Sequence, residues 1–99
     1  MKKVRWARSA QHQLREIVAF IAQDSPKAAS DLATRIRLVT EKIGNQPLAG
    51  QIVPELGDSA IRERRVPPYR VLYSAASSPP KILAIYHQRR LLPVRAEFK

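Results

Sequence analysis

The chain has 99 residues, of which 44% are hydrophobic, and it contains no cysteine. This length predicts a single domain spanning residues 1–99, and the hydrophobic fraction excludes a disordered chain. The lack of cysteine excludes a disulfide framework and a thiolate metal site. The two histidines, His12 and His87, lack the spacing of a metal-ligand pair, so we expect no metal and no cofactor.

Charge is the property that departs most from the average. Lys and Arg number 18 against 8 Asp and Glu, which gives a net charge of +10. Residues 59–99 carry nine basic and two acidic side chains, so a net of +7 lies in this part of the chain. An uneven positive field of this kind indicates an anionic partner, such as nucleic acid, a ribosome or an acidic protein segment.

The sequence offers no candidate for a membrane anchor. No stretch approaches the roughly 20 apolar residues that a membrane-spanning helix needs. Lys2 and Lys3 resemble the start of a signal peptide, but no apolar segment follows them. We therefore expect a cytoplasmic protein without a membrane partner.

The first half of the chain predicts a short strand and two helices. Residues 2–6 alternate between apolar and charged side chains, which predicts an edge strand. Ser9 is expected to cap the first helix, and Ser25 with Pro26 to begin the second. Gly44 is expected to end that helix in the left-handed conformation. So few residues separate the helices that they must form an antiparallel hairpin. Both carry an apolar stripe: Leu14, Ile17, Val18 and Ile21 in the first, and Ala29, Leu32, Ala33, Ile36, Val39 and Ile43 in the second.

The second half predicts a loop and then three strands. Residues 45–58 contain prolines and glycines that interrupt a strand ladder, so we expect them to be irregular. Short turns at Pro67-Pro68 and at residues 77–80 imply an antiparallel meander. Its strands are expected over residues 60–66, 69–75 and 81–87. The predicted fold class is therefore α+β, in the order β-α-α-β-β-β, with an N-terminal strand and a helical hairpin packed on a mostly antiparallel sheet.

This order of elements, together with particular motifs, resembles the RelE/ParE toxin superfamily of type II toxin–antitoxin pairs, and ParE more than RelE. No single motif is specific, whereas their order and spacing along almost the whole chain are. The matching segments are Trp6…Ala10…Leu14…Ile17…Phe20-Ile21, Ser25-Pro26, Pro47-Leu48-Ala49-Gly50, Ile61-Arg62-Glu63, Tyr69-Arg70-Val71-Leu72-Tyr73 and Ile82-Leu83…His87-Gln88-Arg89-Arg90.

The resemblance implies one of two activities. ParE-like toxins inhibit DNA gyrase and stabilise its cleaved-DNA complex without performing chemistry themselves. RelE-like toxins are ribosome-dependent mRNA endonucleases that use no metal. Toxins of both kinds are neutralised by an antitoxin, so the resemblance implies a ParD-like antitoxin and a toxin–antitoxin hetero-oligomer. The expected target is gyrase, and the alternative is the ribosome with its mRNA.

The nuclease alternative requires a base, an acid and cations around the phosphate. His87 is a candidate because its ordinary pKa lies near neutrality. Glu55 is a second proton-transfer candidate, since one nuclease branch uses a glutamate as base, and Arg62 would contact phosphate. A lone histidine is a weak indication of catalysis, and a histidine at a strand end also donates to backbone or to an antitoxin.

In the ParE-like interpretation there is no catalytic residue, and cationic side chains bind the target or the antitoxin. Arg62 and Arg64 are two residues apart on one strand and therefore share a face. With Arg70 on the next strand, the sheet is expected to gather them on one cationic surface. The alternative is that sheet arginines pair with acids such as Glu55, Glu63 or Asp58 and fix the local geometry. The expected binding residues are Arg62, Arg64, Arg70, His87, Arg89 and Arg90.

Two absences favour the ParE-like interpretation. Residues 88–99 contain no tyrosine, where RelE-like nucleases place an acid/base partner, and residues 45–60 contain no lysine or arginine to grip a message. Alternation turns Tyr86 away from His87, and we expect it in the core. By analogy with ParE, the apolar segment Leu91-Leu92-Pro93-Val94 is expected to help engage gyrase.

Overall fold

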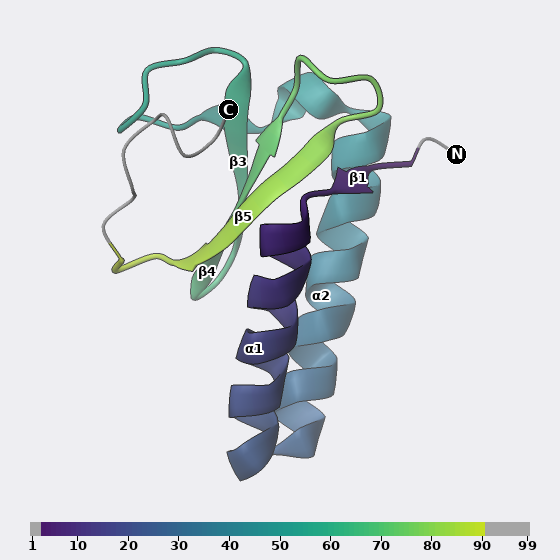
Figure 1. Ribbon diagram of the computed structural model, residues 1–99, viewed down its shortest axis with the longest axis vertical. Helices are drawn as coiled ribbons and strands as arrows, with labels where there is room; N and C mark the ends of the chain where they lie inside the picture. The colour runs from purple at the N-terminus through teal and green to yellow at the C-terminus, as the bar shows by residue number, and fades with distance from the viewer. Residues whose placement is uncertain (1–2, 91–99) are drawn as a thin grey trace.

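The computed structural model describes residues 3–90 and shows the predicted α+β architecture. Figure 1 shows the two helices side by side, with the sheet crossing their upper turns and the lower turns extending beyond it. A two-residue strand and a short 3-10 helix are added to the predicted elements. In chain order the elements are β1 (Arg5–Trp6), α1 (Arg8–Asp24), α2 (Pro26–Asn45), η1 (Pro47–Ala49), β2 (Gln51–Ile52), β3 (Ile61–Val66), β4 (Tyr69–Ser74) and β5 (Lys81–His87).

A single residue, Ser25, connects the two helices of the hairpin. Its hydroxyl accepts a hydrogen bond from the backbone N–H of Ala28 at 3.1 Å, and Pro26 occupies the first turn of α2, so the predicted start is confirmed. The predicted cap at Ser9 is wrong. The N–H of Ala7 still pairs with the Ile82 carbonyl at 2.9 Å, and α1 begins directly after it, at Arg8.

The predicted end of α2 at Gly44 is also wrong. Gly44 lies inside the helix and is buried, and α2 continues to Asn45. Within the described residues, Gly57 is the one with positive φ, at 60°. The helix ends where Pro47 follows, because proline cannot donate the next helical hydrogen bond.

The sheet has five strands in the order β1-β5-β4-β3-β2. Strands β3, β4 and β5 form the predicted antiparallel meander, and β1 is the predicted edge strand, paired parallel to β5. Strand β2, in the segment expected to be irregular, pairs with β3 at the other edge. Strand β1 covers only the start of β5, and farther along the Gln13 side chain of α1 accepts a hydrogen bond from the Ile85 N–H at 2.9 Å. This contact joins the hairpin to the sheet.

Apolar side chains are buried on both faces of the sheet. The helix-facing cluster joins α2 residues such as Leu32 and Ile36 to Val71 and Tyr73 of β4. The opposite cluster contains Val53, Ile61, Leu72, Ala84 and Tyr86. Val53 and Leu56 pack in this second cluster, so the segment 53–60 covers the face of β4 away from the helices. In the part of the chain that the structure describes, no helix is long and apolar enough to cross a membrane.

Candidate binding surface

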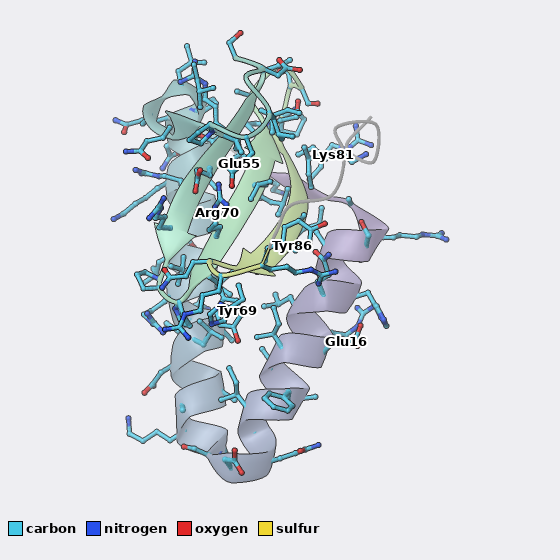
Figure 2. All side chains as sticks on the ribbon, turned by 90° about the vertical axis from the view of Figure 1, so that its left-hand side faces the viewer. Glu16, Glu55, Tyr69, Arg70, Lys81 and Tyr86 are labelled. Carbon is cyan, nitrogen blue, oxygen red and sulfur yellow. The ribbon has the colours of Figure 1, made fainter. Side chains whose placement is uncertain are left out.

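Arg70 is buried and holds two carboxylates. Its Nε and one terminal nitrogen donate to Glu63 at 2.9 and 2.7 Å, and its terminal nitrogens donate to Glu55 at 2.7 and 3.0 Å. The Arg70 and Glu63 side chains are 6% and 1% exposed, whereas that of Glu55 is 47% exposed. Figure 2 shows Glu55 and Arg70 pointing toward each other on the face of the sheet. The interaction ties segment 53–60 to β4.

The same contacts determine the protonation of Glu55. Hydrogen bonds from Arg70 lower the pKa of the Glu55 carboxyl from 4.5 to about 2, and the two carboxylates raise the pKa of Arg70. At neutral pH Glu55 is therefore an anion that binds protons weakly, which makes it a poor general base.

The predicted gathering of Arg62, Arg64 and Arg70 on one cationic surface is wrong. Arg70 lies opposite Arg65 in the β3–β4 register, on the face that carries Glu63, whereas Arg62 and Arg64 alternate with Glu63 and occupy the other face. The alternative interpretation of Arg70, pairing with Glu55 and Glu63, is the observed one.

Arg62 is used to hold the loop before β2. Its guanidinium donates to the backbone carbonyls of Leu48 and Gly50, both at 3.1 Å, and to that of Ser59 at 3.2 Å. Its cross-strand partner Tyr73 acts on the same loop: the hydroxyl donates to the Pro47 carbonyl at 2.6 Å and accepts from the Gly50 N–H at 3.0 Å. Burial raises the pKa of the Tyr73 hydroxyl, so it remains protonated. Both residues therefore position η1 and β2.

Arg64 remains accessible. It is half-buried and lines an open hollow of about 520 Å³ with Arg65, Gly50 and Gln51. Within residues 3–90, Arg64 forms no ion pair with a carboxylate. Of the predicted sheet trio, Arg70 is held by carboxylates and Arg62 by backbone carbonyls, so within the described residues Arg64 is the member whose guanidinium stays available to a partner.

His87, Arg89 and Arg90 lie at the end of β5. The His87 Nδ1 accepts a hydrogen bond from the Arg89 N–H at 3.1 Å, and its ring meets Tyr69 edge-on with centroids 5.6 Å apart. The Arg90 guanidinium lies 5.1 Å from the ring centre of Tyr86. Tyr86 is 7% exposed, which confirms its predicted place in the core. Tyr69, Tyr86, His87 and Arg90 line a pocket of about 240 Å³ together with the α1 residues Gln13, Glu16 and Ile17.

Two arginines near this end of the sheet were not among the predicted site residues. Arg65 follows Arg64 directly, shortly before the Pro67–Pro68 turn, and two adjacent arginines beside a turn are a local pattern that could have indicated Arg65 as a site residue. Arg35 of α2 donates to the Pro67 carbonyl at 3.1 Å across 32 residues of sequence, and no local pattern predicts that contact. Segment 91–94, predicted to help engage the target, lies outside the described residues.

Within residues 3–90, no group of three or more histidine, aspartate or glutamate side chains is placed to hold a metal ion. The side chains of Arg89 and Arg90 are exposed and can bind a partner, whereas Glu55 and Glu63 are both hydrogen-bonded to Arg70.

The sequence and the fold are similar to those of known proteins. A family model described as the ParE toxin of the type II toxin–antitoxin system parDE matches residues 4–92. Among solved structures, the chain is similar to one from the chromosomal ParDE system of P. aeruginosa, with a TM-score of 0.69 and 18% identity over 88% of this chain and 96% of that chain. It is also similar to a chain of the RelBE2 toxin–antitoxin complex from Mycobacterium tuberculosis, with a TM-score of 0.57 and 19% identity over 87% and 90% of the two chains. At these identities the likeness shows a shared fold. A search of curated proteins finds no match.

Proposed function

We propose that this chain, which belongs to the ParE toxin family of type II toxin–antitoxin systems, arrests growth by binding DNA gyrase and stabilising the complex in which gyrase holds cleaved DNA. The observation that carries the proposal is the engagement of Glu55 by Arg70. The candidate carboxylate of the nuclease alternative is thereby paired with an arginine. The arginines that remain unpaired are suited to binding a partner.

Proton-transfer chemistry has little support in this arrangement. A general base works best with a pKa near the working pH, and the pKa of Glu55 is about 2. Arg62, the phosphate ligand of the nuclease alternative, is occupied by three backbone carbonyls. His87 would then act without the other two residues of that set, so we propose that it binds and does not catalyse.

The proposed contacts to a partner come from Arg64, His87, Arg89 and Arg90. Arg64 is half-buried, and Arg89 and Arg90 are exposed. Guanidinium groups present a planar fork of donors that suits carboxylates and phosphates. Arg62 and Arg70 contribute by positioning the loops on either face of the sheet.

The proposed neutralising partner is a ParD-like antitoxin that forms a hetero-oligomer with the toxin in the cytoplasm. The net charge of +10 favours an acidic segment, and such a segment with apolar anchors can fold onto a basic surface. The similarity to a chain from a ParDE system supports this choice.

The proposal is tested by inducing the chain in a bacterial host without its antitoxin. DNA synthesis is expected to stop first, with double-strand breaks in the chromosome and induction of the DNA-damage response. Protein synthesis is expected to continue at that time. Early loss of protein synthesis with cleaved messages and an intact chromosome would instead establish the ribosome as the target.

A further inference from the structure

Four arginines surround the Pro67–Pro68 turn at one end of the sheet. Arg65 precedes the turn on β3, and Arg35 reaches it from α2 through its hydrogen bond to Pro67. Arg89 and Arg90 follow β5 on the other side of the turn, where the N–H of the residue before them donates to the Pro68 carbonyl at 2.8 Å. All four side chains belong to exposed residues. Figure 2 marks this end of the sheet by Tyr69, beside the helices. We name Arg35, Arg65, Arg89 and Arg90 the turn-end cluster.

The acids among residues 3–90 leave most of the charge of the turn-end cluster unpaired. In the described part of the chain, only one of its members contacts a carboxylate: Arg65, 3.6 Å from Glu63 and with its side chain 59% exposed. Both oxygens of Glu63 already accept hydrogen bonds from Arg70. Glu16 lines the pocket beside Arg90, but its carboxylate lies 2.6 Å from His12. Within residues 3–90, the charges of Arg35, Arg89 and Arg90 are therefore not paired with a carboxylate.

Positive charges gathered in this way repel one another, and a partner with closely spaced anions relieves the repulsion. Guanidinium groups match phosphate oxygens in geometry and are common ligands of nucleic-acid backbones. The four arginines come from α2, from β3 and from the segment after β5, so they present a broad set of donors. A row of backbone phosphates fits such a set better than one small anion does.

We propose that the turn-end cluster binds the phosphate backbone of duplex DNA. This contact is separate from binding to gyrase, since the toxin would bind DNA directly. Its use in holding cleaved DNA rests on the proposed function, whereas the DNA contact itself does not.

The neighbouring aromatic rings favour a duplex over single strands. Proteins that bind single strands offer open aromatic faces on which bases stack. Here Tyr86 is buried with Arg90 over its ring, and Tyr69 packs edge-on against His87. Because these rings are engaged within the protein, the cluster is suited to phosphates and not to unstacked bases.

The test measures binding of purified, antitoxin-free toxin to a labelled DNA duplex of unrelated sequence, without gyrase, over a range of salt concentrations. Four phosphate contacts give a slope of log K against log salt of roughly −3 to −4. The double variant Arg89→Gln/Arg90→Gln is expected to lower the magnitude of this slope by about 2. The matched control is Arg5→Gln/Lys81→Gln, which removes the same charge from a β1–β5 pair at the opposite end of β5. It is expected to keep the wild-type slope.

Three results would overturn the proposal. The first is an equal reduction of the salt slope in the control variant, which would mean that net charge alone attracts DNA. The second is tighter binding of a single-stranded RNA of equal length. The third is a lack of duplex binding at low salt. Circular dichroism of each variant establishes that it is folded. Because gyrase is absent, failure here leaves the gyrase proposal standing, and failure of the gyrase proposal leaves this measurement unaffected.

Discussion

The carboxylate of Glu55 accepts two hydrogen bonds from the guanidinium of Arg70, at 2.7 and 3.0 Å, and this pair ties segment 53–60 to the middle of the sheet. The pair lies over the second apolar cluster, on the face of the sheet away from the helices. It therefore links the position of the loop to the stability of the core. Because the pair lowers the pKa of Glu55, it also makes this carboxylate a poor candidate for the general base of a nuclease.

Replacement of Glu55 by glutamine should cost about 1 kcal/mol at pH 7, a value kept small because the side chain is 47% exposed. The pKa of Glu55 is depressed, from 4.5 to about 2. Its contribution is therefore fully present above pH 4.5 and is lost as the pH falls toward 2. Urea unfolding of both proteins at pH 7 and pH 3 measures this, and the difference should shrink at pH 3. Exposed Glu41 on α2, changed to glutamine, is the control. A difference independent of pH would contradict the assigned role of the charge.

Replacement of Arg70 by methionine should cost much more, about 3–5 kcal/mol, because it leaves the buried Glu63 carboxylate with only its longer contact, 3.6 Å from Arg65. The further change Glu63→Gln in that background should recover part of the loss, since it removes the uncompensated charge. Thermal unfolding of the two variants checks this. A single variant as stable as wild type, or a double variant less stable than the single, would refute the account of the buried pair.

Because Tyr73 contacts Gly50, we expect the stability costs of substitutions at these two residues to be non-additive. Tyr73→Phe should cost about 1–3 kcal/mol, because the Gly50 N–H and the Pro47 carbonyl lose their partner. A Cβ at Gly50 would overlap the Tyr73 hydroxyl and lie 2.8 Å from the Glu63 carbonyl oxygen, so Gly50→Ala should destabilise as well. In the Tyr73→Phe background the alanine should cost less, as a double-mutant cycle would measure. Additive costs would show that the overlap with the hydroxyl does not matter.

Arg62→Lys keeps the charge but lacks the fork that reaches three carbonyls. We expect faster hydrogen exchange at Gly50 and Val53, with little change in α1 and α2. An unchanged exchange rate in the loop would mean that Arg62 acts only through its charge. Arg64→Lys on the same face is the matched control, because Arg64 makes none of these backbone contacts.

His87→Ala separates the two candidate activities. If His87 binds and does not catalyse, the purified variant should still inhibit its target to within a fewfold of wild type. A base required for RNA cleavage contributes roughly 10²–10⁴-fold, so the nuclease alternative predicts near-complete loss. The measurement is the toxin concentration that halves growth or target activity.

The elements were largely predictable because each depends on local patterning. Apolar stripes at helical spacing, the Ser25-Pro26 start and the two short turns of the meander are properties of neighbouring residues. The helix start at Arg8 was not predictable, since it depends on the pairing of Ala7 with Ile82. Strand β2 is too short for alternation to indicate it.

The site was less predictable than the fold. Alternation placed Arg62 and Arg64 together, but the face that Arg70 shares with Glu63 follows from the register across the Pro67–Pro68 turn. The pairing of Arg70 with Glu55 joins residues 15 apart, and the Arg35 contact joins residues 32 apart. Charge counting therefore found the arginines but did not separate those that hold the structure from those that face solvent.

Inhibition of gyrase is tested by adding purified, antitoxin-free toxin to gyrase, ATP and relaxed plasmid. The linear DNA recovered after protein is removed should be measured against toxin concentration. We expect linear plasmid to accumulate as supercoiling falls, and premixed cognate antitoxin to abolish both effects. Undiminished supercoiling without linear DNA, from toxin that cleaves mRNA on translating ribosomes, would contradict this expectation.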